Sequence, residues 1–307
     1  MKVITMQKRT LKDWIIATRP WSFTASSIPV LAITAYLFYV CRAEGVVGNW
    51  WNAVLAFPMM VIFQAAGNLI SDYYDHLYLV DLEGSLNGVR HIQSGKFTPA
   101  EVYHFGLALL GVAAVFGAGI LWCSNWHYAW LGLLGVVLAA FYPWIKYHAM
   151  GDVDIALCYA FLPAIGISLI VLGTLRMEVL WLCLPFGLLT VAILHANNTR
   201  DICNDSRAGI TTLPILIGGH ASKWIYIAEV ILPYVLIALF VLLDQLHAWV
   251  FITYLTLPLA IKNVYTMYMA EPQADAPIAT LDQQTAALQL IFGLLFTVSF
   301  VLMTLLT

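Results

Sequence analysis

Residues 178–205 read EVLWLCLPFGLLTVAILHANNTRDICND, and this stretch decides the fold class. Its first part, residues 178–196, is an apolar run with one acidic residue, Glu178, at its start. A helix rises about 1.5 Å per residue and the hydrocarbon core of a bilayer is about 30 Å thick, so the run is nearly long enough to cross it. From Asn197 onward the stretch is polar and acidic. It therefore predicts a transmembrane helix that ends in a polar cluster at the membrane surface.

The rest of the chain repeats this alternation of apolar runs and polar connections. Of its 307 residues, 62% are hydrophobic and 10% are charged, and the mean hydropathy is +0.84. A water-soluble domain could not hide so much apolar surface in one core, so the bilayer is the expected solvent. We expect an all-α polytopic membrane protein with nine transmembrane helices. The apolar runs cover residues 21–41, 51–70, 103–123, 127–145, 153–174, 178–196, 223–243, 246–266 and 286–306.

The basic residues predict how these helices are oriented. When the N-terminus is placed inside, only Arg42 and Arg176 of the 14 Lys and Arg residues fall in outer loops. Because Lys and Arg concentrate in cytoplasmic loops, we expect a multi-pass protein of the inner (cytoplasmic) membrane, with its N-terminus inside and its C-terminus outside. A count of eight helices would place the C-terminus inside. The first run lacks a small-residue cleavage site, so we interpret it as a retained helix rather than a signal peptide.

The first polar cluster closes the second apolar run. Residues 68–75 read NLISDYYD, and Asp81 and Glu83 follow. Spacings of four and three residues place Asn68, Asp72 and Asp75 on one face of a helix. Taken alone, such a cluster could be a solvated helix end.

The second polar cluster closes the sixth run and repeats the arrangement. In residues 197–205, NNTRDICND, the side chains of Asn197, Asp201 and Asp205 again share a face. Carboxylates at the C-terminal end of a helix face the negative end of its dipole and repel one another, so a cation should compensate them. Mg²⁺ typically takes one or two carboxylates together with substrate phosphates. The two clusters therefore predict a site where Mg²⁺ ions hold a diphosphate.

The remaining candidate ligands fit a metal site less well. His76, His91 and His195 lie near the clusters, but their spacing matches no zinc motif, and we expect them to be polar residues at helix ends. The five Cys residues stand singly and are expected to pack among apolar side chains. Six further acidic residues are weaker candidates, because most of them are expected to be solvated loop residues; they are Glu83, Asp152, Asp154, Glu271, Asp275 and Asp282.

Three basic residues are candidates for holding the diphosphate. Arg19 precedes the first run, Lys146 follows the fourth run, and Arg200 lies inside the second cluster. Cations at these positions would stabilise negative charge as it develops on the leaving group. The positive-inside rule alone could also account for each of them.

These segments together resemble the UbiA superfamily of intramembrane prenyltransferases over nearly the whole chain. The resemblance is carried by a first-helix signature at 14–30, a first Asp-rich motif at 68–81, the loop after helix four at 142–151, and a second Asp-rich motif at 197–218. It implies a UbiA-type fold of nine helices around a central cavity. The expected single transmembrane domain, residues 1–307, consists of two four-helix halves, about 14–147 and 153–266, plus a ninth helix at 286–306.

The resemblance also implies a chemistry. Mg²⁺ would neutralise the diphosphate of a polyprenyl substrate and weaken its allylic C–O bond, and an electron-rich aromatic acceptor would attack the resulting cation. Tyr73, Tyr74 and Tyr147 could line the pocket with Tyr142 and stabilise this cation, although an interfacial aromatic belt would also place Tyr there. The predicted metal ligands are Asn68 and the four catalytic residues Asp72, Asp75, Asp201 and Asp205, and the predicted substrate contacts are Asn68, Arg19, Lys146, Asn197, Arg200 and Tyr142.

Within the superfamily, both motifs look most like the 1,4-dihydroxy-2-naphthoate polyprenyltransferases of menaquinone synthesis, whose product is demethylmenaquinone. His76 stands where the 4-hydroxybenzoate branch usually carries an Arg. A sister prenyltransferase acting on 4-hydroxybenzoate, homogentisate, haem or a tetrapyrrole alcohol is the first alternative. An ion-coupled transporter is the second, although transporter carboxylates are expected near the bilayer midplane. The expected partners are the two substrates and membrane lipid, and no nucleic acid.

Overall fold

The computed structural model describes residues 9–78, 91–271 and 278–306. Within these ranges the chain is nearly all helical, and its one β-contact is an isolated bridge between His148 and Thr211. Nine helical spans of the described residues are long and apolar enough to cross a membrane, as predicted. They are Pro20–Glu44, Trp50–Leu77, Pro99–Cys123, Trp126–Lys146, Gly151–Leu172, Glu178–Arg200, Gly219–Leu242, Ala248–Met269 and Leu281–Leu306.

Turns and irregular segments divide several of these spans into separate helices. A 3₁₀ helix at Pro20–Phe23, a π-helix at Leu157–Phe161 and a 3₁₀ helix at Ala248–Thr256 are such segments. The α-helices are α1 (Leu11–Ala17), α2 (Thr24–Glu44), α3 (Trp50–Leu77), α4 (Pro99–Cys123), α5 (Ala129–Lys146), α6 (Gly151–Ala156), α7 (Leu162–Leu172), α8 (Glu178–Leu182), α9 (Leu184–Arg200), α10 (Ile202–Arg207), α11 (Leu213–Ile217), α12 (Gly219–Leu242), α13 (Leu257–Met269) and α14 (Leu281–Leu306).

Some helices begin earlier than their apolar runs. α4 starts at Pro99, four residues before the predicted run, because Thr98 and Glu101 form a capping box. The Glu101 carboxylate accepts a 2.9 Å hydrogen bond from the Thr98 backbone N–H, and the Thr98 hydroxyl accepts one from the Glu101 N–H. Such polar turns satisfy backbone donors at a helix end, so hydropathy alone does not reveal them.

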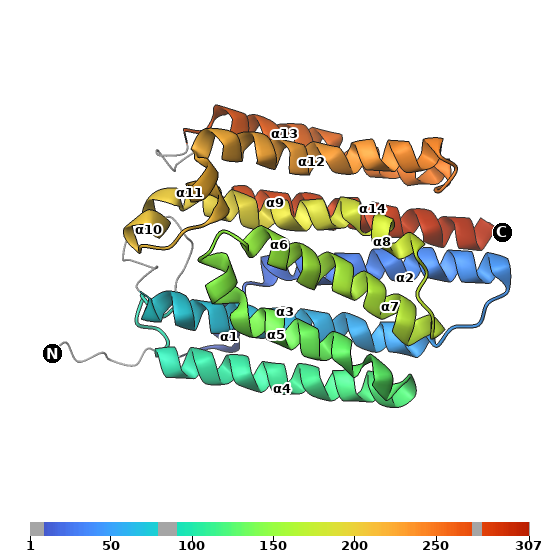
Figure 1. Ribbon diagram of the computed structural model, residues 1–307, viewed down its shortest axis with the longest axis horizontal. Helices are drawn as coiled ribbons and strands as arrows, with labels where there is room; N and C mark the ends of the chain where they lie inside the picture. Colours follow the sequence, from blue (N-terminus) through green and yellow to red (C-terminus); the bar gives the residue numbers. More distant parts are fainter. Residues whose placement is uncertain (1–8, 79–90, 272–277, 307) are drawn as a thin grey trace.

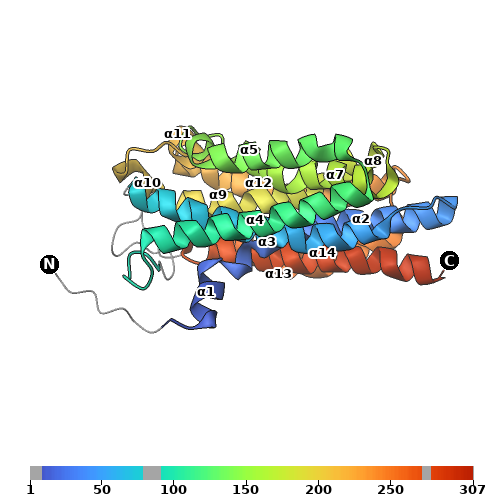
Figure 2. The same cartoon turned by 90° about the horizontal axis from the view of Figure 1, so that it is seen from below.

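The spans run side by side along one axis (Figure 1). α10 and α11 lie at the left-hand end of the bundle, and the C-terminal end of α14 lies at the right; Figure 2 shows the same order after a quarter turn. The spans that contain α9 and α2 are the most enclosed, with 67% and 61% of their apolar windows buried. No residue in the corresponding window of the α5 span is buried. The uncovered surface of α5 is therefore suited to contact lipid.

The core packs most closely where α2 meets α14. A Cβ atom placed on Gly293 of α14 would overlap Cγ2 of Ile28 on α2. Aromatic rings fill the neighbouring space between α9 and α14, where Phe186 and Phe296 lie 4.9 Å apart between ring centroids. Small residues let membrane helices approach closely and gain van der Waals contact.

A buried ionic cluster joins α6, α9 and α12. His195 of α9 is fully buried, and its Nδ1 lies 2.9 Å from Asp152 Oδ2 and 3.6 Å from Glu229 Oε1. Its Nε2 lies 2.9 Å from the Ser222 hydroxyl. The ligand atoms of the three ionisable side chains are within 4.8 Å of one another, near enough for a metal ion, while the His195–Asp152 distance also fits a direct hydrogen bond. The predictions of His195 as a polar helix end and of Asp152 as a solvated residue were wrong, because neighbouring spans cover both.

Candidate functional site

The two acidic clusters face one cavity at the end of the bundle that carries α10 and α11. Its empty volume is about 1270 Å³, the open mouth included. Two predicted site residues, Asp72 and Arg200, are absent from its lining and contact lining residues instead. The predicted residues that do line it are Arg19, Asn68, Asp75, Tyr142, Lys146, Asn197, Asp201 and Asp205.

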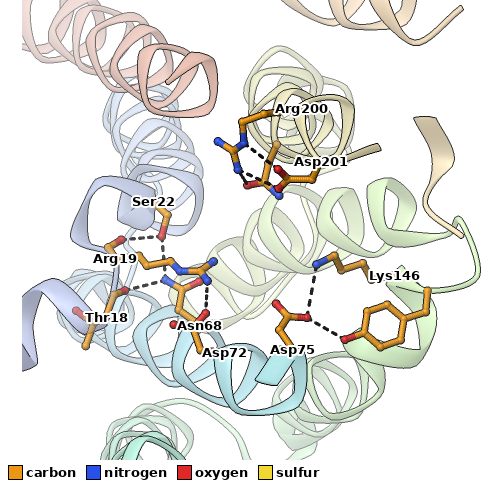
Figure 3. A network of polar contacts seen from close by, with 11 residues as sticks. Thr18, Arg19, Ser22, Asn68, Asp72, Asp75, Lys146, Arg200 and Asp201 are labelled. Carbon is orange, nitrogen blue, oxygen red and sulfur yellow. Dashed lines mark hydrogen bonds and ion pairs between the residues drawn. The ribbon is translucent and has the colours of Figure 1, made fainter. Parts of the chain in front are cut away.

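Arg19 lines the cavity and has an unusual backbone conformation. The chain turns between α1 and the next span with Arg19 at φ 55°, in the left-handed region that L residues seldom adopt. Its guanidinium forms an ion pair with Asp72 of α3 (Figure 3). Burial alone would lower the pKa of Arg19, but the Asp72 and Asp75 carboxylates outweigh it and raise that pKa above its usual value. Arg19 therefore stays charged beside the first cluster.

Asn68 is held by the same turn. Its Nδ2 donates hydrogen bonds to the Thr18 carbonyl oxygen at 2.8 Å and to the Ser22 hydroxyl at 2.9 Å. Both donors of the amide are thereby used on the protein. Its carbonyl oxygen is the remaining group of the side chain that could ligate a metal.

Asp75 lies two turns after Asn68 on α3 and is 5% exposed. Its Oδ1 accepts a 2.8 Å hydrogen bond from the Tyr147 hydroxyl and lies 3.8 Å from Lys146 Nζ. Burial and the neighbouring Asp75 carboxylate raise the pKa of Tyr147, so the phenol keeps its proton and donates. α5 and the residue after it thus position a carboxylate of the first cluster.

The second cluster keeps its predicted common face although α9 ends at Arg200. The backbone N–H of Asp201 bonds to the Asn197 carbonyl at 3.1 Å, and that of Asp205 bonds to the Asp201 carbonyl at 2.8 Å. This helical spacing continues into α10 and brings Asn197, Asp201 and Asp205 to the cavity together.

Arg200 positions this cluster from behind. Its guanidinium, 4% exposed, donates two 3.0 Å hydrogen bonds to Asp201 and one of 2.5 Å to Asn197 Oδ1. It also donates to the Ala279 carbonyl and lies 3.3 Å from Asp282 at the start of α14. Arg200 therefore holds the cluster in place, and its predicted contact with a diphosphate stays a prediction.

The lining carries more negative than positive charge. Among the residues that the structure describes, two cations, Arg19 and Lys146, face five carboxylates: Asp75, Asp154, Asp201, Asp205 and Asp282. Carboxylate and amide oxygens are ligands that Mg²⁺ prefers, and positive side chains beside them suit a polyphosphate. The arrangement can hold a metal-bound anionic group inside the cavity.

Two of these carboxylates were misjudged from the sequence. Asp154 is 3% exposed within the fifth span, and Asp282 lies in the first turn of α14 beside Arg200, so neither is a solvated loop residue. The apolar neighbours of Asp154 in the sequence were the signal that could have predicted its burial. Tyr159 also lines the cavity, whereas Tyr73 and Tyr74 do not. Asp81, Glu83 and Asp275 lie outside the described residues.

Comparison with known proteins decides the family. The profile of the UbiA prenyltransferase family matches residues 31–281, a segment that contains both acidic clusters. The chain belongs to the UbiA prenyltransferase family. This UbiA-family protein is 32% identical over 296 residues to the human "UbiA prenyltransferase domain-containing protein 1", covering 94% of this chain and 83% of the relative. The Xenopus tropicalis protein of the same name is 31% identical over 304 residues, covering 97% of this chain and 84% of the relative.

Solved structures show the same fold. A UbiA homolog from Archaeoglobus fulgidus, solved bound to GPP and Mg²⁺, superposes with a TM-score of 0.62 at 16% identity, covering 93% of this chain and 99% of that one. A digeranylgeranylglyceryl phosphate synthase superposes with a TM-score of 0.57 at 20% identity, covering 97% and 99%. The predicted UbiA-type fold is confirmed, and the protein is a membrane prenyltransferase of this family.

Proposed function

We propose that this prenyltransferase moves a polyprenyl group from polyprenyl diphosphate to an aromatic acceptor in an Mg²⁺-dependent reaction, and that the acceptor is 1,4-dihydroxy-2-naphthoate. The observation that supports the proposal is the lining of one cavity by both acidic clusters together with Arg19 and Lys146. Such a set of oxygen ligands and cations matches a metal-bound diphosphate better than it matches any substrate without phosphate.

The residues that would hold Mg²⁺ are Asn68, Asp72, Asp75, Asp201 and Asp205. When bound, Mg²⁺ would supply Lewis-acid stabilisation of the negative charge on the departing diphosphate. The carboxylates are positioned beforehand: Arg200 fixes Asp201, and Tyr147 fixes Asp75. Positioned charges need little reorganisation as the leaving group develops its charge.

Arg19 and Lys146 would bind diphosphate oxygens directly. Arg19 is paired with Asp72 and Lys146 approaches Asp75, so both cations already lie beside proposed metal ligands. As the allylic C–O bond breaks, negative charge moves onto the diphosphate, and cations in contact with it lower the barrier. Positioning and electrostatics suffice for this step, and no Ser or Cys nucleophile is needed.

The rest of the cavity would shield the allylic cation. Tyr142 and Tyr159 line it together with the apolar side chains of Ile193 and Leu194. Aromatic faces attract a cation, and apolar walls exclude the water that would otherwise capture it. The prenyl tail would continue between helices into lipid.

The acceptor is inferred from the two motifs. The forms NLISDYYD and NNTRDICND look like those of the naphthoate branch, and His76 replaces the Arg of the benzoate branch. The proposed product is the reduced, quinol form of demethylmenaquinone. We further propose that the clusters face the cytoplasm at the inner membrane, as the distribution of Lys and Arg favours.

An acceptor comparison tests this function. Purified protein in lipid nanodiscs is given radiolabelled polyprenyl diphosphate, Mg²⁺ and either 1,4-dihydroxy-2-naphthoate or 4-hydroxybenzoate, and the prenylated product is quantified. Product with the naphthoate alone is the expected result. Product with the benzoate alone would keep the chemistry and contradict the acceptor. Transfer to neither would exclude both of these acceptors, and homogentisate, haem and a tetrapyrrole alcohol would then be tested as acceptors.

A further inference from the structure

One carboxylate in the cavity has none of the partners that hold the others. Asp154 of α6 lines the cavity and is 3% exposed. Its Oδ1 is buried without a hydrogen-bond partner, and no Lys, Arg or His of the described residues forms an ion pair with the side chain. Asp152, two residues earlier on the same short helix, is bonded to His195 instead. The two carboxylates of α6 therefore have different environments.

Burying a carboxylate in this way is unfavourable. An ionised group removed from water without hydrogen bonds or a counter-charge destabilises the fold, and an apolar side chain of similar size would be more stable there. Almost all buried polar groups of folded proteins have partners, so an exception calls for an explanation. A ligand in the cavity that donates a hydrogen bond to this carboxylate would give the side chain a partner.

The surroundings of Asp154 indicate the chemical class of that ligand. Tyr142, Ile155, Cys158 and Tyr159 line the cavity with it. The last two lie in the π-helix Leu157–Phe161, a widened turn of a kind often found at functional sites. Aromatic and apolar walls around one acceptor of hydrogen bonds suit a flat ring that carries a hydroxyl group.

We propose that Asp154 is the general base for the acceptor: it accepts a hydrogen bond from a ring hydroxyl and takes its proton during prenyl transfer. This inference rests on the proposed function. The electron pair of the O–H bond moves into the ring, the ring carbon ortho to the oxygen forms the new C–C bond, and the allylic C–O bond breaks with its electron pair going to the diphosphate. The attacked carbon then loses its proton to an oxygen of the departed diphosphate, or its carboxylate as CO₂, and the ring oxygen recovers a proton from Asp154 as the ring regains aromaticity.

A base at Asp154 requires an acceptor whose ring carries a hydroxyl next to the prenylated carbon. Both naphthoate and benzoate acceptors named above carry such a group, whereas an acceptor whose ring hydroxyl is methylated lacks it. Asp154 would touch the reacting hydroxyl, and the proposed metal ligands would act on the other substrate. The two functions can therefore be separated by mutation.

Asp154→Asn tests the proposal, because the amide keeps the shape of the side chain and cannot take a proton. Transfer at saturating substrates is expected to fall by about 10²- to 10⁴-fold, the usual contribution of a general base. Mg²⁺-dependent binding of polyprenyl diphosphate is expected to stay unchanged, and it also reports that the variant is folded. Asp154→Ser serves the same purpose should the Asn variant not be recovered.

Asp244→Asn is the matched control. Asp244 is exposed at the far end of α12 and has φ 55°, a conformation that Asn tolerates well. This variant should transfer prenyl groups at the wild-type rate.

A fluorinated acceptor with a more acidic hydroxyl tests whether Asp154 acts as a base or has only a structural role. It arrives largely ionised, so the loss in Asp154→Asn should shrink by at least about tenfold relative to the parent acceptor. Equal losses with both acceptors, or wild-type transfer by Asp154→Asn, would overturn the inference while the proposed function stands. Absence of transfer by the wild-type protein with every acceptor would remove the proposed function and this inference with it.

Discussion

At the scale of single residues, the carboxylates of the cavity differ in what holds them. Asp201 accepts two hydrogen bonds from Arg200, and Asp75 accepts one from Tyr147. Fixed carboxylates suit metal ligation, because ligands that are positioned in advance need not be ordered when the metal binds. Asp154 Oδ1 accepts no hydrogen bond from the described residues, and this side chain is proposed to exchange a proton with the substrate. Residue-level tests should therefore separate these two roles.

Asp201→Asn and Asp72→Asn are each expected to reduce prenyl transfer by at least about 10²-fold, because each removes a charge that stabilises the leaving group. The initial rate of transfer at saturating Mg²⁺ measures the effect. Thermal unfolding and Asp244→Asn serve as controls for folding and for the Asp-to-Asn change itself. Full activity in either cluster variant would contradict the metal-diphosphate site.

At the scale of elements, α9 carries the second cluster and depends on its neighbours for position. His195 joins it to α6 through Asp152 and to α12 through Glu229 and Ser222. Removing one partner of a buried ionic cluster leaves the other charges uncompensated. Removal of the imidazole ring should therefore weaken the packing of these three helices.

His195→Ala is expected to lower the free energy of unfolding by about 3–5 kcal/mol. Thermal unfolding in detergent measures it against His104→Ala, which removes an exposed His from α4. Equal midpoints for the two variants would show that the cluster contributes no stability.

Close packing of α2 on α14 gives a second test at this scale. Gly293→Ala places a methyl group against Ile28, and overpacking of this kind costs about 1–3 kcal/mol. Gly119→Ala in α4 is the control, because a Cβ there meets no atom within 4 Å. Adding Ile28→Ala to Gly293→Ala should restore part of the lost stability. A Gly293→Ala variant as stable as Gly119→Ala would contradict the close approach.

At the scale of the whole molecule, the sequence predicted both acidic clusters and the nine spans found among the described residues. Long apolar runs leave few alternatives in a bilayer, and the spacing of Asn68, Asp72 and Asp75 is a local helical property. The partners of buried polar residues could not be predicted in this way. Asp152, His195 and Glu229 lie on three helices far apart in the chain, and only tertiary packing brings them together. The burial of Asp154 was missed for the same reason.

The orientation of the bundle is a prediction that the fold leaves open. The nine spans of the described residues, an odd number, place the two termini of the chain on opposite sides of the membrane, so the C-terminus is expected outside when the N-terminus is cytoplasmic. A C-terminal reporter enzyme that is active only outside the cytoplasm should be active. Activity of a cytoplasm-specific reporter at the same position would reverse the orientation.

We propose above all that the two acidic clusters act together on one metal-bound diphosphate. The most direct measurement is a single-turnover assay of prenyl transfer by wild-type protein in nanodiscs, with Mg²⁺, with EDTA, and with Mg²⁺ restored. We expect transfer to stop in EDTA and to recover fully with Mg²⁺, while Asp75→Asn and Asp201→Asn each require more Mg²⁺ for half-maximal rate. Transfer that continues in EDTA, or unchanged Mg²⁺ dependence in both variants, would contradict the claim.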